Sequence, residues 1–349
     1  MRKKIIHITS SQSPHAFTLT NSLLSNDYCE IDHRLIVYGQ ISEQKKGEIL
    51  QLTDKTDAVS FCNGIMSLIY TLLKIRSRIV VCHGDSYLCR LIPSLLFCRV
   101  VWVCWGAYTT LSGSLLSYIS YPFKYCLNNS LHLVIALMMS DRDDLIKTYH
   151  LSNVILLPYP GTKNKQYFPP SLLDTDGHTQ LRVLIGNSGH CAPWYKDVLQ
   201  SISRFKDENI EVHCMFQYPS FPKQLSELNA VGTQYLGGKF YIDTEYMDKS
   251  EYYKYISSFD VYICPKPSQS GLGAIHIALL LGKKVYLTGK NLKWEQYIGA
   301  KVFEIESLYL GTYSDLCRSL SDKDKEYNRE KIIQLWNNVG EWDKLYKSL

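Results

Sequence analysis

Two glycine-rich turns in the second half of the chain have the composition of anion-binding loops. The first occupies residues 186–189 and ends the apolar run "LRVLI"; the second occupies residues 269–273 and follows the run "DVYIC". Glycines let successive backbone N–H groups face a ligand with no Cβ in the way. Those groups and the positive end of a following helix attract phosphate oxygens. The pair of turns predicts a site for a diphosphate and a ribose. The alternative is that the glycines only fix the geometry of two strand-to-helix turns. The candidate ligand-binding residues in the turns are Gly186, Asn187, Ser188, Gly189, Gln269, Ser270, Gly271, Leu272 and Gly273.

Neither turn matches a standard nucleotide-binding fingerprint. No Gly-Lys-Ser/Thr follows them, so the phosphate loop of P-loop proteins is not indicated. The first strand-to-helix turn of the chain, "ITSSQSPHAF", lacks Gly-x-Gly-x-x-Gly altogether. We therefore do not expect an NAD-dependent enzyme.

Candidate general bases lie in the first half of the chain, again after apolar runs. His15 follows the first run, and His83 and Asp85 follow the run "RIVVC". Each could accept a proton from an attacking hydroxyl group. Isolated histidines are more often structural, and Asp85 would also suit the cap of a helix that begins near Ser86.

The stretch "SDRDD" at residues 140–144 contains Asp-x-Asp, which can hold a metal-bound diphosphate. Ser140 and Asp143 also have capping-box spacing, and acidic residues favour a first helical turn. The capping interpretation is favoured. No other group of His, Cys, Asp and Glu suggests a metal site, so we expect no metal and no cofactor.

Short β-branched runs alternate with longer segments of helical spacing throughout the chain. The runs "KIIHIT", "RIVVCHG", "RVVWVCWG" and "LHLVIAL" read as buried strands of a parallel sheet. A stretch rich in Pro and Gly follows, and the alternation then restarts at residue 181. The fold class predicted is α/β, with two Rossmann-like domains facing each other across a cleft. The predicted divisions are residues 1–160, a linker at 161–180, a second domain at 181–325 and a C-terminal helix at 326–349.

The composition excludes several classes of protein. The chain has 349 residues, is 46% hydrophobic and carries a net charge of only +5. It has no Lys/Arg-rich run, so nucleic acid is not an expected partner. The 11 cysteines form no Cys-x-x-Cys and mostly lie in apolar runs, which is typical of reduced thiols in a cytosolic protein. The first apolar run is too short for a signal peptide, and no run is long enough to span a membrane.

Taken in order, these loops resemble the family that transfers 4-acetamido-4,6-dideoxygalactose (Fuc4NAc) in the synthesis of enterobacterial common antigen. "VLIGNSGH" is similar to that family's strand and Gly-Asn-Ser-Gly loop, and "WVCWGA" to its Trp-x-x-Trp-Gly-Ala. "QSGLG" is similar to its Gln-Gly-Ile-Gly turn. Shorter matches are Pro14-His15, His83-Gly84, Tyr218-Pro219, and Asn291 with Trp294. The chain departs from the family pattern at Asp85, Tyr108 and His190.

The resemblance implies the GT-B glycosyltransferase architecture. It also implies a dTDP-sugar donor bound by the second domain, with Tyr218 and Asn291 added to its site. The acceptor implied is a polyprenyl-diphosphate-linked saccharide, approached by the first domain near Trp105, Gly106 and Tyr108. The enzyme would then work as a peripheral protein on the cytoplasmic face of the inner membrane. The alternatives are a UDP- or GDP-sugar transferase for O-antigen or capsule, and a non-catalytic protein that binds a nucleotide sugar.

Residues 111–129 form the segment best suited to a membrane surface. The segment's large apolar and aromatic residues include Leu115, Leu116, Tyr118, Ile119, Tyr121, Phe123 and Tyr125, and Lys124 is its only charge. Aromatic rings beside a cation suit the bilayer interface. The segment is too short and polar to span, so it would lie on the surface. The alternative is a core helix with tyrosines at its rim.

Overall fold

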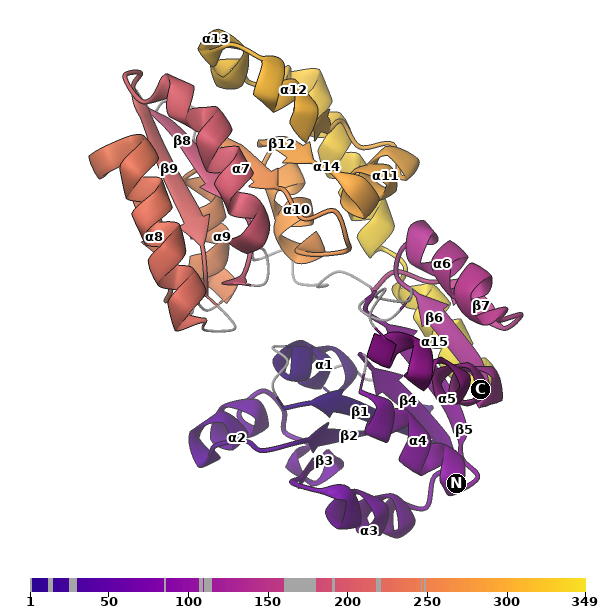
Figure 1. The fold of residues 1–349 in the computed structure, drawn as a ribbon. Coiled ribbons are helices and arrows are strands. Elements are labelled where there is room, and N and C mark those ends of the chain that lie inside the picture. The colour runs from indigo at the N-terminus through magenta and orange to yellow at the C-terminus, as the bar shows by residue number, and fades with distance from the viewer. Residues whose placement is uncertain are drawn as a thin grey trace. The chain divides into compact units, whose positions relative to one another are not determined.

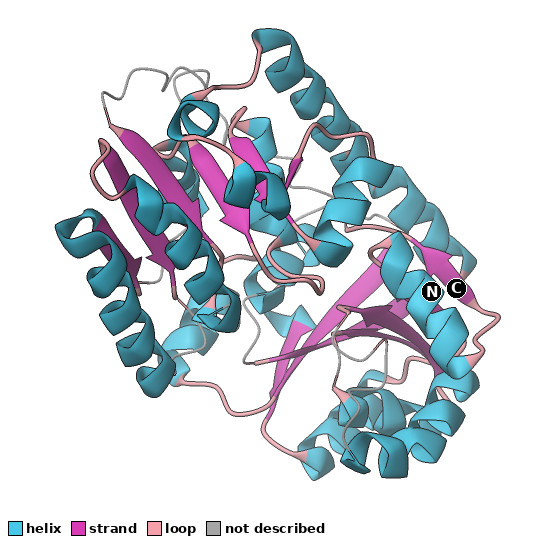
Figure 2. Cartoon of the chain, turned by 45° about the horizontal axis from the view of Figure 1, so that its top comes forward, coloured by secondary structure: helices cyan, strands magenta, loops and turns pink. Residues whose placement is uncertain are grey.

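The structure, a computed structural model, describes residues 2–11, 15–24, 30–84, 86–106, 109, 115–159, 180–189, 192–217, 221–245, 247 and 249–349 (Figure 1). The chain divides into two compact units. The first unit is Met1–Pro160 with Asn338–Leu349, and the second unit is Gly161–Asn337. Each unit is a parallel sheet between layers of helices (Figure 2).

The sheet of the first unit has seven parallel strands in the order β3-β2-β1-β4-β5-β6-β7. The strands are β1 (Lys3–Ser10), β2 (Ile31–Tyr38), β3 (Val59–Cys62), β4 (Ile79–His83), β5 (Arg99–Cys104), β6 (Leu133–Ala136) and β7 (Val154–Leu156). The helices are α1 (His15–Leu24), α2 (Glu43–Leu50), the 3-10 turn η1 (Thr56–Ala58), α3 (Ile65–Ile75), α4 (Tyr87–Leu95), α5 (Leu115–Ser130), α6 (Met139–Tyr149) and α15 (Val339–Ser348).

Alternation along each strand feeds two separate cores, because successive side chains point to opposite faces of a sheet. In β1, Ile6 and Ile8 pack under α3, α4, α5 and α6. Ile5 faces the other way, toward α1, α2 and α15. Burial on both faces explains why these strands read as nearly continuous apolar runs.

The sheet of the second unit has the order β10-β9-β8-β11-β12-β13, and its strands are all parallel. The strands are β8 (Leu181–Ile185), β9 (Ile210–Met215), β10 (Phe240–Asp243), β11 (Val261–Cys264), β12 (Lys284–Leu287) and β13 (Phe303–Glu304). The helices are α7 (Ala192–Ile202) with η5 (Ser203–Phe205), α8 (Pro222–Leu236) with η6 (Gly237–Lys239), α9 (Lys249–Ser257), α10 (Leu272–Leu280), α11 (Gly289–Tyr297), α12 (Ile305–Leu310), α13 (Tyr313–Cys317) and α14 (Asp322–Trp336).

The single C-terminal helix predicted at 326–349 is wrong, because the tail forms two helices that belong to different units. α14 stays with the second unit: the buried side chain of Asn328 bonds the backbone N–H and C=O of Lys301, and Ile332 is fully buried. α15 instead covers the first sheet with Trp342 and other apolar residues. The helices break at residues 337–338, where the Asn338 side chain donates to the Pro158 carbonyl.

Several strands were not predicted from the sequence. β2 carries Asp32, His33 and Arg34, which interrupt its apolar pattern, and β13 has only two residues.

The capping box predicted at Ser140 is absent, since α6 begins at Met139 and Met138 occupies the N-cap position. No described helix is both long and apolar enough to cross a membrane.

Candidate functional site

The strand order of the second unit reverses between β8 and β11, and ligands of such sheets bind at the carboxyl ends of the strands that flank this point. β8 ends at Ile185 and leads into the first glycine-rich turn. β11 ends at Cys264 and leads into the second. The fold therefore brings together two turns that are separated by about 80 residues in the sequence.

The two turns are in direct contact. The Ser270 hydroxyl donates to the Asn187 side-chain oxygen over 3.2 Å. Gly271 has a φ of +64°, and a Cβ at this position would lie 2.8 Å from the Asn187 side chain. The left-handed backbone and this close approach both require glycine. The two turns therefore form one structure, and their binding of a diphosphate and a ribose stays a prediction.

Asn291 holds the second turn in place and is itself fully buried. Its side-chain nitrogen donates to the Ser270 carbonyl over 2.9 Å, and its oxygen accepts from the Ser270 N–H over 3.3 Å. These two hydrogen bonds satisfy the backbone N–H and C=O of Ser270, which lies beyond the end of β11. Asn291 is thus a positioning residue, and Trp294 of the same helix is buried.

Gly186 is required by a contact that the sequence did not reveal. Its φ is +73°, and a Cβ there would overlap the hydroxyl of Tyr195. Tyr195 is fully buried in α7, and its hydroxyl oxygen lies 2.9 Å from the carbonyl oxygens of both Ser188 and Met215, which share its single hydrogen. Tyr195 therefore holds the backbone of the first turn in place. No pattern in the sequence distinguishes it from an ordinary core tyrosine.

The first turn of α10 is the part of this site that is open. Gly271 is its N-cap, and a Cβ at Gly273 would have nothing within 4 Å. The leading N–H groups of a helix have no partners within it, and the helix dipole adds partial positive charge there. Lys266 in the same loop lies over the ring of Trp194 at 5.7 Å and adds a full positive charge. This arrangement can bind an anion such as a diphosphate.

In the first unit, the loops after β4 and β5 pack against each other. Gly84 has a φ of +93°, and a Cβ there would lie 2.8 Å from the ring of Trp105. The Trp102 indole donates to the Gly84 carbonyl over 2.8 Å. Gly84 of the "HG" motif and Trp105 of the "WGA" motif therefore pack together, and Gly106, next to Trp105, has a φ of +85°.

His83 belongs to a buried chain of three histidines, which we call the histidine chain: His7, His33 and His83. His7 lies between the other two, with its ring nitrogens 3.0 Å from His83 Nε2 and 2.8 Å from His33 Nδ1. His83 Nδ1 lies 2.6 Å from the hydroxyl of Tyr159, which also accepts from the Trp105 indole over 3.1 Å.

Burial favours the neutral form of His7 and His33. It lowers the pKa of His7 well below 6.5, and the neighbouring rings of His33 and His83 lower that pKa further. Burial also lowers the pKa of His33 to about 4, although Asp32 and Asp343 oppose the shift. His83 is only 4% exposed and has partners at both ring nitrogens. Its geometry suits the positioning of the strand-end loops rather than direct proton transfer.

Tyr159 connects the histidine chain to the place where the chain leaves and re-enters the first unit. Its ring stacks on Trp342 of α15, with centroids 5.5 Å apart and planes 6° apart. The Trp342 indole donates to the carbonyl of Pro158 over 2.9 Å. Neither His7, His33 nor Tyr159 was predicted from the sequence.

Some predicted site residues lie outside the described part of the chain: Asp85, Tyr108, Tyr218 and the side chain of His15. His15 itself begins α1, directly after β1. Gly189 is buried in the first turn. In the second turn, Gln269 is half-buried and Leu272 begins α10. Within the described residues, no group of three or more His, Cys, Asp and Glu side chains could hold a metal ion.

Residues 115–129 of the segment predicted for the membrane surface lie in α5, and one side of that helix is exposed. Leu116 is 77% exposed and Phe123 is 50% exposed. Phe123 contacts the ring of Tyr87, and the Lys124 ammonium lies 5.8 Å from that same ring. The opposite side packs on the core through Tyr121, Tyr125 and Leu127.

Comparison with known proteins agrees with this geometry. The sequence model of glycosyl transferase group 56, described as 4-alpha-L-fucosyltransferase, matches residues 2–326. No curated protein matches the chain. Three solved structures have a similar fold: sucrose-phosphate synthase from Thermosynechococcus elongatus (TM-score 0.72, 12% identity, 99% of each chain covered), HepE from Anabaena in complex with UDP and glucose (0.71, 12%, 97% of this chain and 99% of that one), and a glycosyltransferase from Rickettsia africae (0.68, 13%, 99% and 98%). The architecture is that of the GT-B glycosyltransferases, with two Rossmann-like domains.

Proposed function

This chain belongs to the 4-alpha-L-fucosyltransferase family of glycosyltransferases, and we propose that it moves a deoxyamino sugar from a dTDP donor to a saccharide on a polyprenyl diphosphate. The sugar proposed is Fuc4NAc or a close relative. The observation that carries the donor half of this proposal is the open first turn of α10, held beside Asn187 by Ser270 and Asn291.

The chemistry follows from where charge develops. When the glycosidic bond of the donor breaks, negative charge builds up on the leaving diphosphate. The unpaired N–H groups of α10 and the charge of Lys266 are fixed in advance at the proposed diphosphate position, so they stabilise that charge without reorganisation. No metal ion is needed in this scheme.

The acceptor hydroxyl must lose a proton, and we assign that proton to His15. His15 stands at the carboxyl end of β1, where its backbone begins α1. Asp85 is the second candidate, because His83 already has partners at both ring nitrogens. A general base contributes about 10²–10⁴-fold in rate. His15→Ala should therefore lower turnover by about that factor and leave dTDP affinity unchanged, and near-normal turnover would transfer the role to Asp85.

Calorimetric titration of the full chain with dTDP, UDP and GDP tests the nucleotide. The proposal expects the tightest binding for dTDP. Tighter binding of UDP or GDP would favour a transferase for O-antigen or capsule. Binding of a donor sugar without turnover in a membrane extract would favour a non-catalytic protein that binds a nucleotide sugar.

A polyprenyl-linked acceptor stays in the membrane, so the proposal also places the first unit at the inner membrane's cytoplasmic surface. The exposed side of α5 supports this, since Leu116, Ile119 and Phe123 are 77%, 67% and 50% exposed. Burying such side chains at a bilayer interface is favourable by about 25 cal/mol per Å² of apolar surface.

Vesicle flotation tests the role of α5. Leu116→Asp/Phe123→Asp should lose attachment to phosphatidylcholine vesicles. A matched double variant on the second unit, Leu310→Asp/Ile333→Asp, should keep it, since Leu310 and Ile333 are also exposed. Equal flotation of the α5 variant and the unmodified chain would place the attachment elsewhere.

A further inference from the structure

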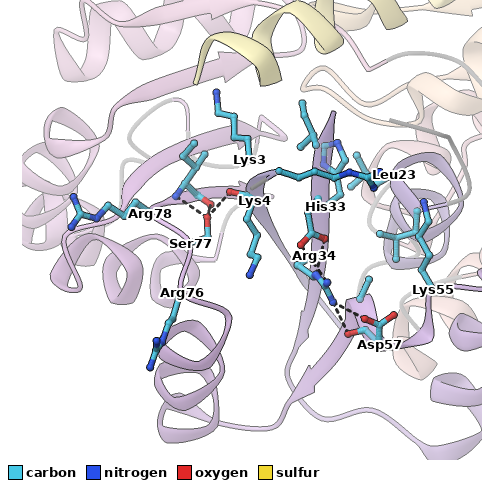
Figure 3. Close-up of a pocket in the computed structure, with 16 residues that line it drawn as sticks. Lys3, Lys4, Leu23, His33, Arg34, Lys55, Asp57, Arg76, Ser77 and Arg78 are labelled. Atoms are coloured by element: carbon cyan, nitrogen blue, oxygen red, sulfur yellow. Dashed lines mark hydrogen bonds and ion pairs between the residues drawn. The ribbon is translucent and has the colours of Figure 1, made fainter. Parts of the chain in front are cut away.

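A basic pocket lies at the amino ends of β1, β2 and β4, at the opposite end of the strands from the His83 and Trp105 loops. Its volume is about 780 Å³ (Figure 3). The walls come from the starts of these strands, from η1, from the end of α1 and from the loop after α3. Nothing in the proposed transfer reaction uses this end of the sheet.

The pocket concentrates positive charge. Seven cationic side chains line it, against two carboxylates, Asp32 and Asp57. This excess equals the formal net charge of the whole chain. In Figure 3 the labelled cations lie around the opening rather than gathered at one point. The cations are Arg2, Lys3, Lys4, Arg34, Lys55, Arg76 and Arg78.

Four of the seven cations are available to a ligand. Both carboxylates already pair with Arg34, at 2.8 and 2.9 Å. Lys3 and Lys4 donate to backbone carbonyls. No side-chain hydrogen bond or ion pair joins the other four to the described chain: Arg2, Lys55, Arg76 and Arg78. The pocket is therefore a site of uncompensated positive charge, suited to phosphate groups.

Arg76 occupies a position that favours glycine. It follows α3 with a φ of 56°, in the left-handed region, and its N–H bonds the Leu72 carbonyl over 3.2 Å. Helices that end this way mostly carry glycine or asparagine at this residue, because a side chain is strained there. Arginine goes against this backbone preference, and residues that go against local preferences are often functional.

Two exposed apolar side chains precede β4 and β5 in the sequence, and they favour a lipid over a soluble anion, although they do not line the pocket itself. Leu73, one turn before Arg76, is 58% exposed. Phe97 is 92% exposed, and its φ of 58° is also left-handed. Arg76 precedes β4 and Phe97 precedes β5; these strands pair, and the Arg99 N–H bonds the Arg78 carbonyl. An exposed aromatic ring at the same end of the sheet as these cations suits the interface of an acidic bilayer.

We propose that the basic pocket binds the phosphate of an acidic phospholipid headgroup while Phe97 enters the lipid surface beside it. The choice of a bilayer rests on the membrane-bound acceptor of the proposed function, but the pocket does not. The pocket adds a salt-sensitive, lipid-selective attachment to the apolar contact of α5.

Vesicle sedimentation of the full chain tests this, with phosphatidylcholine alone and with added phosphatidylglycerol. The vesicles contain neither acceptor nor nucleotide sugar, so the outcome is independent of transfer. The variant Lys55→Ser/Arg76→Gly/Arg78→Ser should lose about a hundredfold in affinity for the acidic vesicles only. A control with the same change of net charge, on the second unit, should bind as the unmodified chain does: Lys206→Ser/Lys223→Ser/Lys323→Ser.

Two single variants guard against misfolding as the cause. Arg76→Gly should melt at the same temperature or higher, because it removes backbone strain, yet bind acidic vesicles about fivefold less tightly. Phe97→Gly should likewise stay folded and bind about tenfold less tightly. The proposal is overturned if phosphatidylglycerol gives no gain in binding, if both triple variants lose equally, or if the pocket binds inorganic pyrophosphate in calorimetry without any preference for acidic vesicles.

Discussion

Replacing Gly273 with alanine separates contact with the donor from stability of the fold. At Gly271 an added Cβ would strike Asn187 on a left-handed backbone, so loss of binding there would say little about ligands. At Gly273 the backbone is helical and a Cβ meets nothing within 4 Å. Alanine is favoured over glycine in a helix by up to about 1 kcal/mol, so Gly273→Ala should melt at the same or a higher temperature.

The same methyl group would stand where the donor diphosphate is proposed to sit. Hydrogen bonds to a charged group contribute about 1.5–3 kcal/mol each, and displacing the phosphate from one such N–H should weaken dTDP binding by about 10- to 150-fold. Calorimetric titration with dTDP measures this loss directly. Thermal denaturation of the same preparation shows whether the variant is folded.

Gly47→Ala is the matched control. Gly47 is also helical, in α2 of the first unit, with nothing within 4 Å of an added Cβ. It should gain similar stability and leave dTDP affinity unchanged. A folded Gly273→Ala variant with undiminished affinity would refute the assignment of the diphosphate to the first turn of α10.

Three further outcomes follow from the contacts. Gly186→Ala should destabilise the fold by about 2–4 kcal/mol in urea denaturation, because Tyr195 is held by two carbonyls and cannot move aside; an unchanged midpoint would contradict this. Tyr159→Phe removes the hydroxyl that contacts both His83 and Trp105. The variant should lose about 1–3 kcal/mol of unfolding free energy and some turnover, while its affinity for dTDP, measured by calorimetry, should stay unchanged. Burial lowers the pKa of His33 to about 4, whereas unfolded histidine titrates near 6.5, so the unfolded chain is protonated first as pH falls. The free energy of unfolding should therefore be full above pH 6.5 and fall by about 2–3 kcal/mol as pH falls toward 4, and His33→Gln should flatten that slope.

The donor-side turns were predictable because their position depends on topology alone. Asn187 and Ser270 lie far apart in the sequence, yet each follows an apolar strand and precedes a helix. In a doubly wound parallel sheet all such turns lie on one edge. Glycines then indicate which of these turns leave the backbone open to a ligand.

The histidine chain needed information that the sequence does not contain. His7, His33 and His83 meet only because β1 lies between β2 and β4, with His7 opposite Leu35 and Val81. A change of one residue in register would turn a histidine to the other face of the sheet. The return of α15 to the first unit was hidden for a similar reason: its Trp342 is apolar in the sequence, but which sheet it covers depends on the whole fold.

The most direct test of the proposed reaction is a mass spectrum of the lipid-linked saccharide that accumulates in a strain lacking this gene. We expect that strain to accumulate a polyprenyl diphosphate saccharide that is one deoxyamino sugar short. Adding the purified protein with a dTDP-deoxyamino sugar should restore the missing mass. An unchanged glycolipid in the deletion strain, or extension only from a UDP- or GDP-sugar, would contradict it.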